Sequence, residues 1–162
     1  MRMTLHSDYS LRVLLALGVA EGRRGTIGAI AAQYGISRNH LMKVCHRLQQ
    51  LGYIETVRGK NGGLWLARDP ASIRVGDVVR DMEPDLDLVE CFSDANRCVI
   101  TGDCRLQHVL SDGLKAFFDT LNRNTLADLL DVGPRLADAL NGVRPAIAIR
   151  PAIPVRRAPR EP

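Results

Sequence analysis

The chain has 162 residues, of which 46% are hydrophobic, enough to build one folded domain with an appended element. Its 22 lysines and arginines against 18 aspartates and glutamates give a formal net charge of +4, a mildly basic balance that permits a polyanionic partner. The apolar run at residues 11–20 contains Arg12 and is too short to cross a bilayer, so we expect no membrane span, no secretory leader and a cytoplasmic protein.

The first expected helix begins between Thr4 and Asp8 and ends near Glu21, before Gly22. Apolar residues occupy nearly every side of this helix, so we expect most of it to be buried. Asp8 stands out in this stretch. Judged by its position alone, it is a negative charge favoured by the positive N-terminal end of the helix dipole.

A helix-turn-helix pattern follows. A short helix over residues 27–34 ends at Gly35, and Ser37 is placed to cap a second helix that ends at Gly52. In helix-turn-helix proteins the second helix enters the major groove with its N-terminal residues on the base edges. The polar and basic residues at its start are therefore candidate DNA contacts: Ser37, Arg38, Asn39, His40 and Lys43. A solvated amphipathic helix has a similar pattern, so this motif is weak by itself.

Two short strands, at residues 53–58 and 64–67, are joined by a turn rich in glycine and asparagine, which tolerate positive φ. A hairpin directly after the second helix is typical of a wing. Its tip carries Arg58, Lys60 and Asn61, which we expect to reach phosphates or the adjacent minor groove. The stretch from Ser37 to Gly63 contains five basic residues and one acidic residue. This excess of positive charge favours DNA contact over the alternative that the charges only keep the hairpin soluble.

The remaining elements suggest an architecture that is mainly α, with a small β-hairpin wing. We expect a winged helix-turn-helix domain at residues 1–83, a cysteine loop at 84–104, and a dimerisation helix with a short following helix at 105–132. Apolar residues at helical spacing, from Leu106 to Leu121, form a stripe that a second copy of the helix would cover. Residues 133–162 are rich in arginine and proline, and we expect them to be a disordered extension.

Three cysteines, Cys91, Cys98 and Cys104, lie in one acidic loop, with six and five residues between them. Thiolates are soft anionic ligands, so this spacing favours an iron-sulfur cluster or a soft metal ion over ordinary reduced thiols. Zinc could use the same thiols. The fourth cysteine, Cys45, lies far upstream on a helix and is expected in the core, so a fourth ligand must come from elsewhere. A thiol redox enzyme is a weaker alternative because the chain has no CxxC pair and no acid/base constellation, and we expect no enzyme.

Several motifs together closely resemble the NsrR family of bacterial nitric-oxide-sensing repressors. They are the opening MRMTLHSDYSLRVLLAL, the run SRNHLMKV, the wing VRGKNGGLWLA, the segment IRVGDVVRDMEP and the three spaced cysteines. The resemblance covers about residues 1 to 132. It implies a homodimeric winged-helix repressor that loses its DNA when nitric oxide attacks the cluster, so that genes for nitric oxide detoxification are expressed.

The resemblance also implies a set of ligands. The cluster, [4Fe-4S] or [2Fe-2S], would be held by Cys91, Cys98 and Cys104, with the partner subunit's Asp8 as the fourth ligand. The related iron-sulfur assembly regulators of the IscR type instead use a histidine three residues after the third cysteine. Here that position is Gln107, and His108 follows it. The NsrR-type ligand set is therefore favoured, and His108 is the alternative ligand.

Overall fold

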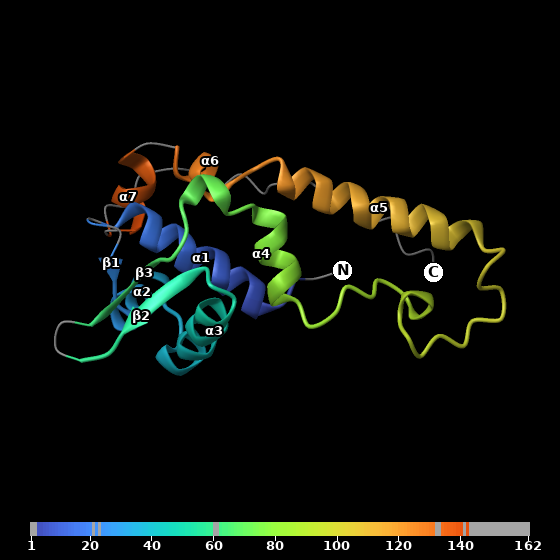
Figure 1. Ribbon diagram of the computed structural model, residues 1–162, viewed down its shortest axis with the longest axis horizontal. Coiled ribbons are helices and arrows are strands. Elements are labelled where there is room, and N and C mark those ends of the chain that lie inside the picture. The colour runs from blue at the N-terminus through green and yellow to red at the C-terminus, as the bar shows by residue number, and fades with distance from the viewer. Residues whose placement is uncertain are drawn as a thin grey trace, which may run out of the picture.

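The computed structural model describes residues 3–20, 22, 24–59, 62–131, 134–140 and 142 of the chain. Figure 1 shows a winged domain built around α1, from which α5 and the segment before it extend to one side. The elements of the winged domain are α1 (Leu5–Val19), β1 (Arg24–Gly25), α2 (Ile27–Tyr34), α3 (Arg38–Gln50), β2 (Ile54–Val57), β3 (Gly63–Leu66), the 3-10 turn η2 (Pro70–Ser72) and α4 (Val75–Met82). The rest comprises the 3-10 turn η3 (Glu90–Phe92), α5 (Arg105–Asn122), α6 (Leu126–Leu130) and α7 (Pro134–Leu140).

Helix α1 is the centre of the winged domain. It begins at Thr4, whose side chain accepts a hydrogen bond from the Ser7 amide, as expected of an N-cap threonine. Val13, Leu14 and Leu17 are fully buried and join one hydrophobic core with residues of α2, α3 and α4. None of the helices that the structure describes is long and apolar enough to cross a membrane.

The helix-turn-helix forms for local reasons that the sequence shows. Helix α2 ends at Gly35, whose φ of 63° lies in the left-handed region that glycine adopts most easily. Helix α3 buries Leu41, Val44 and Leu48, spaced by three and four residues, on one side. Ser37 occupies the N-cap position of α3 as expected, but its side chain makes no capping hydrogen bond.

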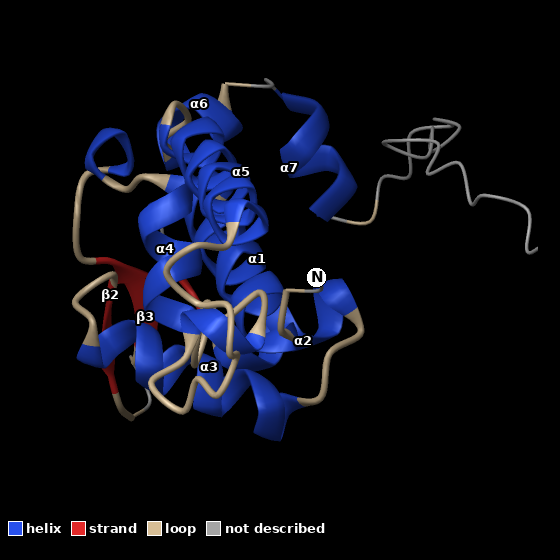
Figure 2. Ribbon diagram, turned by 90° about the vertical axis from the view of Figure 1, so that its right-hand side faces the viewer, coloured by secondary structure: helices blue, strands red, loops and turns tan. Residues whose placement is uncertain are grey.

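The wing belongs to a three-stranded antiparallel sheet in the order β1-β3-β2. Glu55 lies opposite Trp65 on β3, which in turn lies opposite Arg24 on β1. The Trp65 indole donates a hydrogen bond of 2.9 Å to Glu55, so the outer face of the sheet has its own polar link. Figure 2 shows β2 and β3 side by side, next to α3. The expected hairpin is confirmed, whereas the two-residue strand β1 was not expected.

Helices α4, α5 and α6 meet at one junction. The Val75 amide donates to the Asn124 carbonyl, and the Leu126 amide donates to the Ile73 carbonyl, which ties the start of α4 to the link between α5 and α6. Helix α6 opens with a capping box in which Thr125 and Asp128 exchange hydrogen bonds. The hydrogen bonds from Thr125 lower the pKa of Asp128.

Helix α7 corrects one expectation. Residues 134–140 belong to the extension that was expected to be disordered, yet they form a helix that lies against α1. A helix of seven residues is too short to show a clear apolar period, and tertiary contact stabilises it. The arginine- and proline-rich stretch from Arg144 onward lies outside the described residues.

Candidate nucleic-acid interface and cysteine segment

A groove of about 710 Å³ lies between α3, the start of α2 and the wing. On the α3 side it is lined by Arg38, Met42, Cys45, His46 and Gln49, and on the wing side by Thr56, Val57, Arg58 and Gly59. The groove is therefore built from the two elements with which a winged helix-turn-helix protein holds DNA.

Three of the expected contacts on α3 lie where DNA can reach them. Arg38, Asn39 and Lys43 are exposed, on the side of the helix away from its buried leucines and valine. Arg38 also lines the groove. Ser37 is exposed just before the helix. These four positions stay candidates for phosphate and base contact.

His40 points differently from the other candidates. Its ring lies 5.0 Å from the Tyr9 ring and 6.2 Å from the His6 ring, measured between centroids, and both partners belong to α1. Burial lowers the pKa of His6, and the electrostatic effect of the neighbouring His40 ring lowers it further. His40 therefore packs α3 against α1, so we regard it as the weakest DNA candidate of the five.

The wing tip is partly described. Arg58 is exposed and lines the groove, as its expected role requires. The turn depends on two glycines: Gly59 has a φ of 105°, and a Cβ on Gly62 would lie 2.1 Å from the Val57 carbonyl oxygen. Lys60 and Asn61 lie outside the described residues, so their roles remain predictions.

Met42, Gln49 and Thr56 also line the groove, although the sequence analysis did not select them as DNA contacts. The Thr56 hydroxyl donates a hydrogen bond of 2.8 Å to the Gln49 side chain, which joins α3 to the wing across the groove. The signal that could have identified Met42 is its helical spacing, because it lies one turn beyond Arg38 on the same side of α3.

The end of α3 is anchored to the rest of the domain by side chains. Arg68 donates hydrogen bonds to the carbonyls of Leu51 (2.6 Å) and Gly52 (2.9 Å), and its guanidinium lies 4.5 Å from the centre of the Tyr53 ring. The Tyr53 hydroxyl donates to Asp81 on α4 over 2.7 Å. Burial and this hydrogen bond raise the pKa of Tyr53. Helix α3, the expected recognition helix of the helix-turn-helix, is thus connected to α4.

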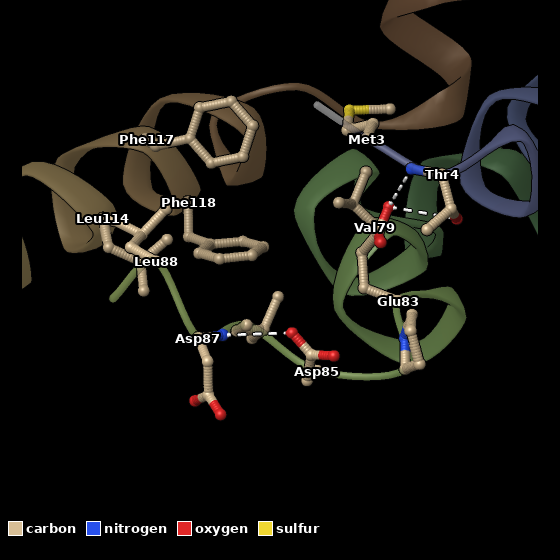
Figure 3. Close-up of a pocket in the computed structure, with 12 residues that line it drawn as sticks. Met3, Thr4, Val79, Glu83, Asp85, Asp87, Leu88, Leu114, Phe117 and Phe118 are labelled. Atoms are coloured by element: carbon tan, nitrogen blue, oxygen red, sulfur yellow. Dashed lines mark hydrogen bonds between the residues drawn. The ribbon is translucent and has the colours of Figure 1, made fainter. Parts of the chain in front are cut away.

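The C-terminal end of α4 is also connected to α1. The Glu83 carboxylate accepts hydrogen bonds from the Thr4 amide (2.9 Å) and from the Ser7 hydroxyl (2.5 Å), which close the first turn of α1. Figure 3 shows Glu83 beside Thr4 in a pocket of about 260 Å³, whose far wall is formed by Phe117 and Phe118 of α5. The segment that leads to the cysteines therefore starts from a point fixed to both α1 and α3.

The three cysteines of the loop lie between α4 and α5. Cys91 lies in η3 and Cys104 at the N-cap of α5, and both are half-buried, whereas Cys98 is exposed. All are free thiols. Around them, Val99 is 98% exposed and Ile100 is 58% exposed, so little of the chain covers this segment. Figure 1 shows that the segment runs from α4 alongside α5 and turns back at the far end of that helix, away from the winged domain.

The side chains of this segment are chemically suited to bind an iron-sulfur cluster. Three free thiols within one segment supply the soft ligands that cluster iron takes. Among the residues that the structure describes, however, no three His, Cys, Asp or Glu side chains are gathered closely enough to hold a metal ion. Cluster binding would therefore require the segment to close around the group. Cys91, Gln107 and His108 line one cavity of about 520 Å³, so the alternative ligand lies on the same side as the first cysteine.

Asp8 lies in the first turn of α1, as expected of a negative charge that the positive end of the helix dipole favours. It forms an ion pair with Arg12, with contacts of 2.8 and 3.0 Å between the two side chains. The structure does not bring it together with the cysteines of the same chain. The role of Asp8 as a ligand donated across a dimer stays a prediction.

Cys45 is 2% exposed within the core, as expected. Burial raises the pKa of its thiol to about 11, so it remains protonated at neutral pH. It is therefore unsuited to be a fourth ligand of the cluster.

The model of one protein family, described as "Rrf2: Iron-dependent Transcriptional regulator", matches residues 3–132. The chain belongs to the Rrf2 family. The match covers both the winged domain and the cysteine segment. The mainly helical fold with a small β wing that the sequence predicted is confirmed by the elements of the structure.

Relatives within the Rrf2 family share both sequence and architecture with the chain. It is 50% identical over 133 residues to the HTH-type transcriptional regulator NsrR of Bacillus subtilis, covering 80% of this chain and 90% of that protein. It is also 50% identical over 133 residues to NsrR of Geobacillus kaustophilus, again covering 90% of that protein and 81% of this chain. The solved structure of T. potens IscR superposes with a TM-score of 0.64 at 27% identity, covering 81% of this chain and 87% of that one. The resemblance found in the sequence is therefore confirmed.

These relatives are transcriptional regulators, so this Rrf2 protein is a DNA-binding regulator and not an enzyme. The groove between α3 and the wing is the candidate surface for DNA binding.

Proposed function

We propose that this Rrf2 protein is a dimeric repressor that senses nitric oxide through an iron-sulfur cluster and then releases operators of nitric oxide detoxification genes. The proposed ligands are Cys91, Cys98, Cys104 and the partner subunit's Asp8. The observation that carries the proposal is the set of three free, solvent-accessible thiols on a segment anchored at both ends, to α4 and to α5. Similarity to proteins named NsrR supports the choice of effector.

The proposed dimer rests on the apolar surface of α5. The side chains of Leu106 and Val109 are 63% and 65% exposed. Of the α5 residues that the structure describes, only Phe118 is buried. Apolar side chains that are exposed along one side of a helix typically mark a surface at which another protein surface binds. A second copy of α5 would cover them and would place two recognition helices on two half-sites of DNA.

The chain's own residues provide a route from the cluster segment to the DNA-binding elements. When bound, the cluster supplies iron with which nitric oxide reacts. The thiolates of Cys91, Cys98 and Cys104 would then hold the segment closed around it. Glu83, at the start of this segment, bonds to the first turn of α1, and Asp81 bonds to Tyr53 beside α3. A change in the segment's order can therefore shift the equilibrium between two positions of the recognition helices.

The test compares Cys98→Ala and Asp8→Ala with the wild type in anaerobic preparations. Absorption spectra, iron and sulfide counts, and operator binding before and after nitric oxide would be measured. We expect Cys98→Ala to abolish stable cluster assembly. Asp8→Ala should retain a cluster with an altered spectrum and an altered DNA response, because a carboxylate is a harder and weaker ligand for iron than a thiolate.

Two outcomes would contradict the proposal. Equal operator binding by cluster-loaded and cluster-free protein would remove the sensor function, whatever the cluster type. A colourless protein with stoichiometric zinc would show that the thiols hold a structural metal ion.

A second candidate is an IscR-type regulator with a [2Fe-2S] cluster that senses iron-sulfur or redox status. The observation that favours it is the shared cavity of Cys91 and His108. His108→Ala distinguishes the two candidates. It should leave the cluster spectrum unchanged if Asp8 is the ligand, and it should change the spectrum if His108 is.

A further inference from the structure

Two exposed apolar side chains lie in the DNA-facing groove, where packing of the protein does not explain them. Met42 on α3 is 48% exposed and Val57 on β2 is 52% exposed, and both line the groove. The other large exposed apolar residues that the structure describes lie elsewhere: Leu5 at the start of α1, Val99 and Ile100 in the cysteine segment, and Leu106 and Val109 on α5. An apolar side chain at the centre of a recognition helix needs a separate explanation.

The direction of Met42 follows from the geometry of α3. Successive residues of a helix point about 100° apart, so Met42 lies in line with Arg38 one turn before it and near His46 one turn after it. Leu41, Val44 and Leu48 are fully buried and mark the opposite, inward side. Met42 therefore projects from the helix toward the space that a DNA duplex would occupy, between the charged groups of Arg38 and the imidazole of His46.

The charge of the groove favours DNA as its occupant, and of the two exposed apolar side chains that line it, Met42 is the one on α3. Arg38 and Arg58 line the groove, one from α3 and one from the wing, and a guanidinium group suits a phosphate or a guanine. A methionine can neither donate a hydrogen bond to a base edge nor bind a phosphate. In the major groove, the one apolar group by which base pairs differ is the C5-methyl of thymine.

We propose that Met42 is a specificity-determining residue that selects thymine at one position of each half-site by packing against its C5-methyl group. Methionine is suited to such a contact, because its unbranched and polarisable side chain adapts to a small apolar surface. The inference rests on the proposed dimer and on DNA contact through α3, whichever residues hold the cluster and whichever effector it senses.

The experiment removes single methyl groups from the DNA. The full chain, purified anaerobically, is first used to select a preferred duplex from a random pool. Each thymine of that duplex is then replaced, one at a time, by uracil, which lacks the C5-methyl and keeps the hydrogen-bonding groups. We expect one thymine in each half-site whose replacement weakens binding about fourfold, the value of roughly one buried methyl group.

Variants then assign the methyl contact to Met42. Met42→Ala should bind the thymine and uracil duplexes with equal affinity, and because Met42 is half-exposed this variant should fold. Met42→Leu should keep the preference for thymine, whereas Met42→Gln, similar in length but polar, should lose it. Lys43→Ala is the matched control on the next residue: it should weaken both duplexes and leave their affinity ratio unchanged.

The outcomes separate this inference from DNA binding itself. A selected duplex that tolerates uracil at every thymine would overturn the role of Met42 and leave DNA binding intact. A thymine preference that persists in Met42→Ala would assign the methyl contact to another residue. Failure to select any sequence would overturn both this inference and sequence-specific binding through α3.

Discussion

The Tyr53 hydroxyl donates a hydrogen bond of 2.7 Å to Oδ2 of Asp81, and so joins the residue before β2 to the last turn of α4. Tyr53 is 2% exposed, so its hydroxyl has little access to water. Because the acceptor is a carboxylate, Tyr53→Phe should lower the free energy of unfolding by about 1 to 2 kcal/mol, as measured by urea denaturation at pH 7. Asp81→Asn retains an oxygen acceptor and should cost less. Unchanged stability in Tyr53→Phe would show that the bond is not formed in solution.

The thiol of Cys45 should resist alkylation in the folded protein. It is buried and its pKa is raised to about 11, whereas the other three cysteines lie on an uncovered segment. In cluster-free protein at pH 8, iodoacetamide should modify Cys91, Cys98 and Cys104, and should modify Cys45 only after urea is added. Mass spectrometry of the peptides would measure this, and rapid labelling of native Cys45 would contradict its burial.

The same thiol should make stability depend on alkaline pH. Its folded pKa, about 11, lies above the ordinary value of 9.0 expected in the unfolded chain, so the folded state retains the proton more strongly. The resulting stabilisation is fully present below pH 9 and is lost as the pH rises toward 11. Denaturation at several pH values should show a smaller loss in Cys45→Ala than in wild type. Equal losses in both proteins would assign the effect to other groups.

The junction of α4 and α5 should not tolerate a side chain at Gly76. A Cβ at this position would lie 2.3 Å from the Asn122 side-chain oxygen; Gly76 is buried, and the Asn122 side chain is held in place by the hydrogen bond that its amide donates to Asp77. We expect Gly76→Ala to lower stability by about 1 to 3 kcal/mol, as overpacking usually does. Gly113→Ala is the matched control in a helix: a Cβ there meets nothing within 4 Å, and the substitution should stabilise by about 0.5 to 1 kcal/mol. Thermal unfolding of both variants would measure the contrast.

DNA affinity should fall steeply with salt, because binding by arginine and lysine releases counterions from phosphates. Lys43 is exposed on the outward side of α3, so Lys43→Ala should lower the slope of log affinity against log salt by about one unit. Lys115 is exposed on α5, away from the groove, and Lys115→Ala should leave the slope unchanged. An unchanged slope in Lys43→Ala would remove Lys43 from the phosphate contacts. Lys60→Ala is expected to act as Lys43→Ala does.

Much of the fold follows from local patterns in the chain. The apolar period of Leu41, Val44 and Leu48 was enough to predict α3, because helix neighbours lie three and four residues apart. Gly35 and Gly59 also predicted the ends of elements, because glycine adopts the positive φ that both residues have. The capping box of Thr125 and Asp128 also lies within one helical turn. The three cysteines were recognised as a site because they are close in sequence.

Other features depend on residues that are distant in the chain, and only the tertiary structure decided them. Strand β1 has two residues and exists because β3 pairs with it, and α7 is stabilised by α1. The orientation of His40 toward Tyr9 distinguishes it from Arg38, although both lie in the first turn of α3. The 2.7 Å bond between Tyr53 and Asp81 spans 28 residues of sequence. Local patterns show which residues share a side of a helix, but which partner that side meets depends on how the elements pack.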